Sequence, residues 1–238
     1  MRHDITDQQR LIFALDFAEP AEALAWVKRL EGRVTFFKVG LQLFIAGWWP
    51  VVDEIVARGQ QVMLDLKFFD IPETVQKAVT QLQNHGVSLA TIHGNDAIVR
   101  AAVAAKGDIK LLAVTVLTSF DESDLRQMGL TGSVADLVRQ RAARAVALGC
   151  DGVVCSPHEV AALRGELGDD FLAVTPGIRP AAAAGDDQRR VATAGAAIAN
   201  GADHLVVGRP IATAADPLAL VDELQAEIAT ARATSLFK

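Results

Sequence analysis

The chain has 238 residues, of which 51% are hydrophobic, so it is long enough to bury one large core. Its net charge of −6 and pI near 5.4 argue against a surface that binds nucleic acid or anionic membranes, although a pocket for a small anion is compatible with them. The start, MRHDITDQQR, lacks the pattern of a secretory signal, and no apolar run approaches the roughly 18 residues of a membrane span. We therefore expect a cytoplasmic protein with no membrane or nucleic-acid partner. Cys150 and Cys155 are expected to be buried reduced thiols rather than metal ligands.

Short apolar runs alternate with segments of helical spacing along the chain. The runs predict strands at residues 11–17, 36–40, 63–67, 88–93, 110–117, 151–155, 171–175 and 204–207. The spacing predicts helices at residues 20–30, 49–58, 73–85, 96–106, 134–148, 158–167, 188–200 and 218–229. A longer excursion precedes the helix that starts at Val134.

These strands are too continuously apolar to have a face in water, which is typical of a parallel sheet covered by helices. Eight strand–helix units in 238 residues favour a closed (β/α)8 TIM barrel. With no linker or change in composition, we expect residues 1–238 to form a single catalytic domain. A doubly wound open sheet is the alternative, but it would usually carry a glycine-rich turn after its first strand, where this chain has DFAEP.

Polar side chains stand at or just beyond the C-terminal ends of the predicted strands: Asp16, Lys38, Asp65, Lys67, His93, Thr118, Ser119 and Arg209. In a barrel these ends converge on one mouth, where active sites are built. A lone histidine is more often structural than catalytic, so we interpret His93 as a hydrogen-bonded structural residue.

The segment MLDLKFFDIPET, residues 63–74, carries three charges at the end of an apolar run. Side chains alternate along a strand, so Asp65 and Lys67 are expected to point the same way, with Asp70 in the loop that follows. The simplest interpretation of such a pair is a solvent-exposed salt bridge without a function. The surrounding leucines and phenylalanines favour a functional one, because charges in apolar surroundings must be paired, shifted in pKa or functional.

Together Lys38, Asp65, Lys67 and Asp70 would form an array of alternating charge that needs no metal ion. Such an array can stabilise charge as it develops, above all where an anion leaves and a carbanion appears beside an ammonium group. Lys67 could donate the proton, and Asp65 would crowd a substrate carboxylate and favour its departure. These residues therefore predict a decarboxylation without metal or cofactor.

Phosphate binding is predicted after the last two strands, where barrels commonly hold phosphate through backbone N–H groups. The loops read TPGIRP at residues 175–180 and VVGRP at residues 206–210. Gly208 lets the backbone approach an oxyanion closely, and Arg209 can pair with it bidentately. Residues 179–187 are expected to form either a lid or a surface loop without function.

The motifs LDF, FKVG, DLKFFDIPET, LTS, TPGIRP, DDQRR and VVGRP occur in the order found in the bacterial orotidine 5′-phosphate decarboxylase family, which the chain resembles over nearly its whole length. The resemblance implies decarboxylation of orotidine 5′-phosphate to UMP, the last step of de novo UMP synthesis, with Lys67 as the proton donor. It also implies a homodimer in which Asp70, Ile71 and Thr74 reach the partner's site.

The resemblance extends to substrate contacts. Asp16 and Lys38 would hold the ribose hydroxyls, Asp65 would flank the reacting carbon, and Thr118 and Ser119 would meet the pyrimidine. The lid and phosphate contacts it implies are Pro176, Arg179, Gln188, Gly208 and Arg209. Two departures from the family pattern are HGND at His93, in place of a small-residue run, and the adjacent Trp48 and Trp49, read either as helix-entry packing or as a subunit contact.

Two other functions remain open at this point. A Mg²⁺-dependent sugar-phosphate decarboxylase of the same superfamily shares the Asp-x-Lys-x-x-Asp segment, but it would need a carboxylate where Lys38 stands, and an ammonium group repels a divalent cation. A non-catalytic barrel that binds nucleotide phosphate would be expected to have lost one of the four charges, and none is missing.

Overall fold

The computed structural model describes residues 5–180 and 191–235. Eight parallel strands form a closed barrel in chain order, because β1 pairs with both β2 and β8. The strands are β1 (Leu11–Ala14), β2 (Phe36–Gly40), β3 (Gln61–Phe68), β4 (Leu89–His93), β5 (Lys110–Val114), β6 (Gly152–Val154), β7 (Leu172–Thr175) and β8 (His204–Val207). The predicted (β/α)8 barrel is confirmed.

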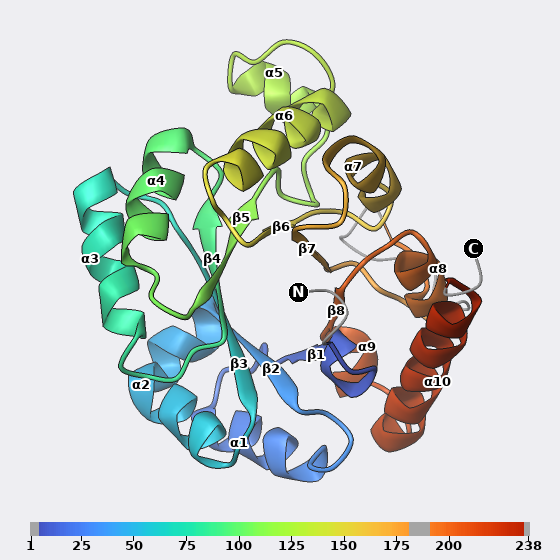
Figure 1. The fold of residues 1–238 in the computed structure, drawn as a ribbon. Coiled ribbons are helices and arrows are strands. Elements are labelled where there is room, and N and C mark those ends of the chain that lie inside the picture. Colours follow the sequence, from blue (N-terminus) through green and yellow to red (C-terminus); the bar gives the residue numbers. More distant parts are fainter. Residues whose placement is uncertain (1–4, 181–190, 236–238) are drawn as a thin grey trace.

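Helices surround the barrel on its outside (Figure 1). They are α1 (Pro20–Arg29), α2 (Leu41–Ala57), α3 (Pro72–Leu82), α4 (Asp96–Ala105), α5 (Glu122–Gln127), α6 (Val134–Ala147), α7 (Val160–Leu167), α8 (Ala194–Ala199), α9 (Arg209–Ala212) and α10 (Pro217–Ser235). A 3-10 turn, Gln8–Arg10, precedes β1. Among the described residues, none of these helices is long and apolar enough to cross a membrane.

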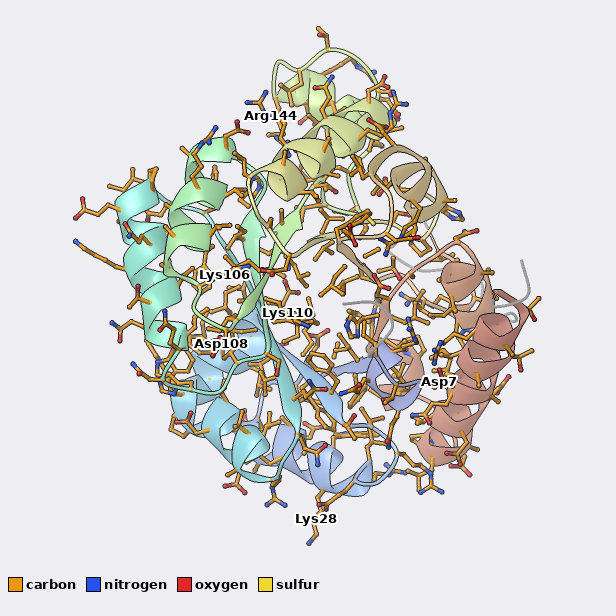
Figure 2. The ribbon with its side chains drawn as sticks, viewed as in Figure 1. Asp7, Lys28, Lys106, Asp108, Lys110 and Arg144 are labelled. Carbon is orange, nitrogen blue, oxygen red and sulfur yellow. The ribbon has the colours of Figure 1, made fainter. Side chains whose placement is uncertain are left out.

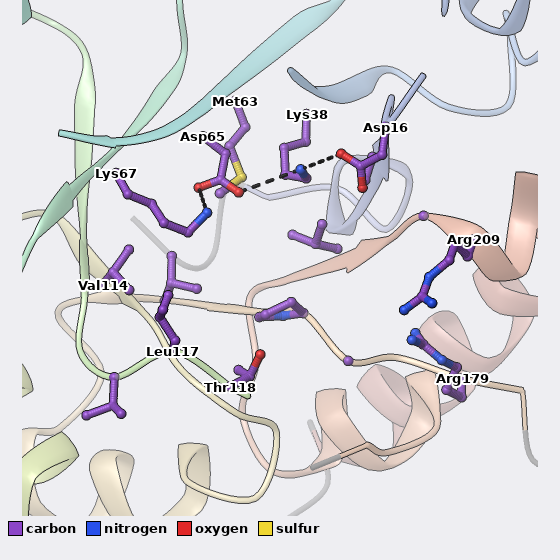
Figure 3. Close-up of a pocket in the computed structure, with 17 residues that line it drawn as sticks. Asp16, Lys38, Met63, Asp65, Lys67, Val114, Leu117, Thr118, Arg179 and Arg209 are labelled. Carbon is purple, nitrogen blue, oxygen red and sulfur yellow. Dashed lines mark hydrogen bonds and ion pairs between the residues drawn. The ribbon is translucent and has the colours of Figure 1, made fainter. Parts of the chain in front are cut away.

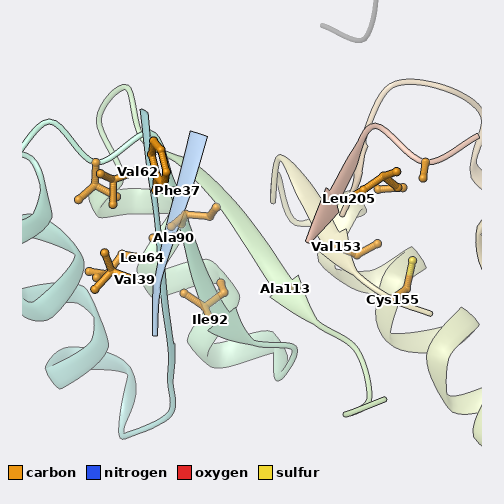
Figure 4. Close-up of a cluster of buried hydrophobic side chains, with 14 of the residues drawn as sticks. Phe37, Val39, Val62, Leu64, Ala90, Ile92, Ala113, Val153, Cys155 and Leu205 are labelled. Carbon is orange, nitrogen blue, oxygen red and sulfur yellow. The ribbon is translucent and has the colours of Figure 1, made fainter. Parts of the chain in front are cut away.

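The core has two layers, which explains why the strands are apolar on both faces. Side chains such as Phe37, Leu64 and Leu205 pack outward from the strands toward the helices (Figure 4). Phe36 and Met63 belong to a separate buried cluster to which seven of the eight strands contribute. Burying a large apolar side chain contributes about 1.5–3 kcal/mol, so both layers stabilise the barrel. Charged side chains such as Lys28 and Arg144 project away from it (Figure 2), and Cys150 and Cys155 are buried free thiols, as expected.

Helix α2 begins earlier than the predicted 49–58. It starts at Leu41 and is broken at Trp48, whose φ of 49° and ψ of −149° are not helical. The second half restarts at Pro50, a residue suited to the first turn of a helix. Trp49 stacks on His85 with ring centroids 3.7 Å apart, whereas the Trp48 side chain is exposed. Helix-entry packing therefore describes Trp49 but not Trp48.

Two short helices were not predicted. Helix α5 lies in the excursion before α6 and is closed by a capping box between Asp121 and Asp124, each accepting a backbone N–H of the other. Helix α9 follows β8 directly. Strands β1 and β5 end earlier than predicted, at Ala14 and Val114, so that the residues after them form loops at the barrel mouth.

Candidate active site

Strand β3 is irregular where it carries its charged residues. Between Leu64 and Phe68 it runs past only Ala90 to Ile92 of β4, so the pairing register shifts and β3 bulges. Lys67 lies in this bulge with φ +50°, a left-handed conformation that is uncommon for a residue other than glycine. The sequence predicted a regular strand at this position. The irregular segment carries Asp65 and Lys67, which both line the same cavity.

Three of the four predicted charges meet at the mouth of the barrel, together with Asp16. The Asp65 carboxylate joins two ammonium groups, with Oδ1 2.9 Å from Lys67 Nζ and Oδ2 3.6 Å from Lys38 Nζ. Lys38 Nζ also donates to Asp16 Oδ1 at 3.0 Å. The result is a continuous chain of alternating charge (Figure 3).

The Asp65 carboxylate is held ionised in spite of its burial. Its side chain is only 14% exposed. Burial alone would raise the pKa of Asp65, but the charges of Lys38 and Lys67 and the hydrogen bonds from Lys67 and Thr91 outweigh it, so the pKa lies below its ordinary value. A preorganised anion therefore faces the pocket between two cations.

The charged side chains of Asp16, Lys38, Asp65 and Lys67 line one side of a cavity of about 430 Å³. Met63 and Val114 contribute apolar surface next to Asp65 and Lys67 (Figure 3), and Val154 also lines the cavity. Electrostatic interactions are stronger beside such surfaces than in water. The cavity is large enough for a small molecule of nucleotide size, since small-ligand pockets begin at about 300 Å³.

The other end of the cavity carries the predicted phosphate residues. Arg179 and Arg209 lie on the side of the cavity opposite Lys67 in the view of Figure 3, and their guanidinium groups point toward one another. Gly208 follows β8 and lies close to β1, since a Cβ there would stand 3.2 Å from Ala14 Cβ. Only glycine fits comfortably at that contact. Pro176 and Thr118 also line the cavity.

Several predicted site residues lie elsewhere in the single chain. Asp70 is exposed, and its carboxylate accepts the Ile71 backbone N–H at 2.6 Å rather than approaching Lys67. Ile71 and Thr74 are exposed beside it, and Ser119 is exposed and outside the set of cavity residues. Gln188 lies outside the described residues. Within one chain, the array thus consists of Lys38, Asp65 and Lys67, and Asp70 does not join it.

His93 is at the end of β4 but does not line this cavity. Its Nδ1 is 2.8 Å from Asn95 Oδ1, and its ring packs against Phe69 with centroids 4.4 Å apart. Gly94 follows it in close contact with β5, since a Cβ there would be 3.0 Å from the Val114 carbonyl oxygen. These contacts are those of a structural residue in a tight loop.

Sequence reasoning missed two groups of residues. One is the apolar wall of the cavity, which only the pattern of inward-facing strand positions could have indicated. The other is Thr91, which is fully buried on β4 and hydrogen-bonded to both Asp65 and Lys67. A threonine in a strand carries no distinctive sequence signal. Among the described residues, no group of His, Cys, Asp and Glu side chains could hold a metal ion.

The fold and the site together define a (β/α)8-barrel protein with a charged, nucleotide-sized pocket at its C-terminal mouth. Comparison with known proteins identifies its family. The chain belongs to the orotidine 5′-phosphate decarboxylase / HUMPS family, whose model matches residues 9–224.

Similar proteins span nearly the same length. An orotidine 5′-phosphate decarboxylase of Methylococcus capsulatus is 52% identical over 221 residues, which are 92% of this chain and 91% of that protein. One from Rhodopseudomonas palustris is 49% identical over 230 residues, 96% of this chain and 98% of that protein. The crystal structure of orotidine 5′-phosphate decarboxylase from Lactobacillus acidophilus superposes with a TM-score of 0.82 at 35% identity, over 92% of this chain and 99% of that one.

Proposed function

We propose that the protein decarboxylates orotidine 5′-phosphate to UMP and CO2 in pyrimidine biosynthesis, without metal or cofactor. The observation that carries this proposal is the Asp65 carboxylate held between the ammonium groups of Lys38 and Lys67. Family membership and relatives at about half identity, all named for this reaction, support it. We further propose that the whole chain acts as one catalytic domain in the cytoplasm.

In the proposed mechanism, the substrate carboxylate is bound against Asp65, and the repulsion between the two anions is relieved when CO2 leaves. The bond between the ring carbon and the carboxyl carbon breaks, and its electron pair stays on the ring carbon. The Lys67 ammonium group, next to that carbon, stabilises the carbanion and transfers a proton to it. The neutral amine then regains a proton from water.

The remaining residues hold the two ends of the substrate. Asp16 and Lys38 bind the ribose hydroxyls, and Thr118 and Ser119 contact the pyrimidine. The phosphate lies between Arg179 and Arg209, whose guanidinium groups suit a dianion. Its other proposed contacts are Pro176, Gln188 and the backbone at Gly208.

The proposed functional unit is a homodimer, because Asp70, Ile71 and Thr74 lie outside the pocket of their own chain. The candidate contact surface consists of exposed apolar side chains, namely Phe69 and Ile71 in the same loop and Leu41, Ile45 and Trp48 in α2, each more than half exposed. Exposed apolar groups of this size mark interaction sites. A second copy that buries this surface would bring Asp70 to the partner's Lys67 and complete the array of four charges.

The main alternative is a Mg²⁺-dependent sugar-phosphate decarboxylase of the same superfamily. Lys38 disfavours it, because its ammonium group already occupies the space between the carboxylates of Asp16 and Asp65. One assay separates the two functions and the non-catalytic barrel. The ultraviolet absorbance of orotidine 5′-phosphate is followed with purified protein, once without and once with EDTA. We expect full turnover; activity that EDTA abolishes would favour the alternative, and no turnover at all would refute the proposal.

A further inference from the structure

Thr91 is connected to both halves of the Asp65–Lys67 pair without reaching the cavity. Its side chain is fully buried on β4 and does not belong to the cavity lining. The Lys67 backbone N–H donates to Thr91 Oγ1 at 2.9 Å, and Thr91 Oγ1 donates to Asp65 Oδ1 at 2.9 Å. One hydroxyl group thus connects the backbone of the proposed proton donor to the carboxylate beside it.

The directions of these two hydrogen bonds are fixed by their chemistry. A backbone N–H can only donate, so the hydroxyl must accept from Lys67 and use its single proton elsewhere. An ionised carboxylate can only accept, so that proton points to Asp65 Oδ1. The same oxygen receives the Lys67 ammonium group at 2.9 Å. The Thr91 hydroxyl, the Asp65 carboxylate and Lys67, through its backbone N–H and its ammonium group, thus form a closed ring of hydrogen bonds. Each bond in the ring limits the movement of the two residues it joins.

The bulge in β3 explains why the Lys67 backbone N–H is available to the Thr91 hydroxyl. Lys67 leaves the regular ladder with β4 where the register shifts, and its left-handed backbone directs its N–H to the Thr91 side chain. We propose that Thr91 is a positioning residue for the decarboxylation, holding the Lys67 backbone and the Asp65 carboxylate in the geometry that the proton transfer requires. This inference rests on the proposed function.

Removal of the hydroxyl should also change the ionisation of Asp65. Facing that carboxylate in the described chain are Lys38 from β2, Lys67 from β3 and Thr91 from β4. All three favour its ionised form. Without the hydroxyl, Asp65 takes up a proton at a higher pH, so activity that needs the carboxylate is lost at a higher pH on the acid side.

The test compares Thr91→Val, which keeps the shape but not the hydroxyl, with Thr91→Ser, which keeps the hydroxyl. We expect kcat on orotidine 5′-phosphate to fall about 10- to 100-fold in the valine variant, with UMP affinity changed less than about threefold, and to recover largely in the serine variant. The acid limb of the kcat/KM profile should move to higher pH in the valine variant only. Thr115→Val is the matched control, because Thr115 is a buried threonine whose hydroxyl donates to a backbone carbonyl, that of Val154.

A valine variant with unchanged kcat and an unchanged acid limb would overturn the inference. So would a loss of kcat that serine does not restore, or one in which UMP binding is lost in proportion, since both indicate a merely structural role. If Thr91→Val does not fold, Thr91→Cys is compared with Thr91→Ser, because the thiol is a much weaker hydrogen-bonding group of similar size. Failure of the wild-type protein to turn over the substrate would instead refute the proposed function itself.

Discussion

Gly40 leaves the space that the ammonium group of Lys38 occupies, since a Cβ at position 40 would stand 3.0 Å from Lys38 Nζ. The same Cβ would lie 3.3 Å from Asp16 Oδ1. The atoms it would meet are the ends of side chains rather than backbone. A side chain at position 40 would therefore disturb the charged array more than the fold.

We predict that Gly40→Ala lowers kcat/KM by about tenfold or more, because a small displacement of a positioned group has a large effect on rate. Thermal stability should change little, since the Gly40 φ of −95° suits alanine. Steady-state kinetics and thermal unfolding are measured together. Gly165→Ala in α7 is the control, as nothing lies within 4 Å of its added Cβ. Unchanged kcat/KM in Gly40→Ala would show that Lys38 tolerates displacement.

For Lys67→Ala we expect kcat to fall by about 10²- to 10⁴-fold, the usual contribution of a positioned proton donor. UMP binding, measured by calorimetry, should be retained, because UMP carries no group that takes the proton. Lys77→Ala serves as control, since Lys77 is 73% exposed and pairs with Glu73 on the same helix. Equal losses of kcat and UMP affinity would assign Lys67 to binding instead.

The shared site can be tested by mixing two inactive variants. If Asp70 acts in the partner's pocket, a heterodimer of Lys67→Ala and Asp70→Ala subunits contains one site in which both residues are intact. Random exchange of subunits should then restore about a quarter of the wild-type activity, since half of the dimers are mixed and each has one complete site. A mixture that stays inactive after confirmed exchange would place Asp70 outside catalysis or inside its own subunit.

Arg209→Ala should raise KM for orotidine 5′-phosphate by roughly 10- to 100-fold, the loss expected for a charge-assisted contact. The same change should hardly affect the slow reaction of orotidine, which has no phosphate. The comparison of the two substrates is the measurement. Arg139→Ala, on the exposed face of α6, is the control. If both substrates suffer alike, Arg209 contributes to the pocket's structure rather than to phosphate binding.

His204 predicts a pH dependence of stability. Its burial lowers its pKa from 6.5 to about 4, only partly offset by the hydrogen bond with the Gln9 carbonyl. The unfolded chain takes up a proton at His204 near pH 6.5, while the folded chain does so only near pH 4. Stability therefore falls as the pH drops through this window, by up to about 3 kcal/mol.

Denaturant unfolding at pH 7 and pH 5 measures this effect. In His204→Gln the difference between the two pH values should shrink, because no group at position 204 titrates. His158→Gln, at an exposed histidine, should keep the wild-type difference. A wild-type stability that does not change over this range would contradict the assigned neutral state of His204.

Much of the fold could be predicted because each strand contains a short apolar run, and polar residues stand at or just beyond the C-terminal ends of several of these runs. Lys38, Asp65 and Lys67 were located in this way, and their meeting at one mouth follows from the parallel barrel. The break in α2 at Trp48 and the presence of helix α5 could not be predicted in this way. Both depend on local turn and cap geometry, such as the Asp121–Asp124 capping box, and the sequences that form it resemble ordinary loops.

Thr91 shows where reasoning from the sequence reaches its limit. Its role depends on the β3 bulge, which places it beside both Asp65 and Lys67, and a two-residue alternation rule assumes that no bulge is present. Asp70 shows the opposite limit. The sequence placed it near the charged strand end, but the exposed loop directs its carboxylate to the Ile71 N–H and away from its own pocket.

The charge of the cavity lining is opposite in sign to the net charge of the whole chain. The chain carries a net charge of −6, yet the cavity is lined by Lys38, Lys67, Arg179 and Arg209 against only Asp16 and Asp65. Beyond the Debye length, about 8 Å in physiological salt, the acidic exterior is screened, and a compact anion at the mouth meets an attractive electrostatic funnel. A nucleic-acid strand, too broad to enter, would encounter only the repulsive exterior. The protein thereby separates small polyanions from large ones by size before any specific contact forms.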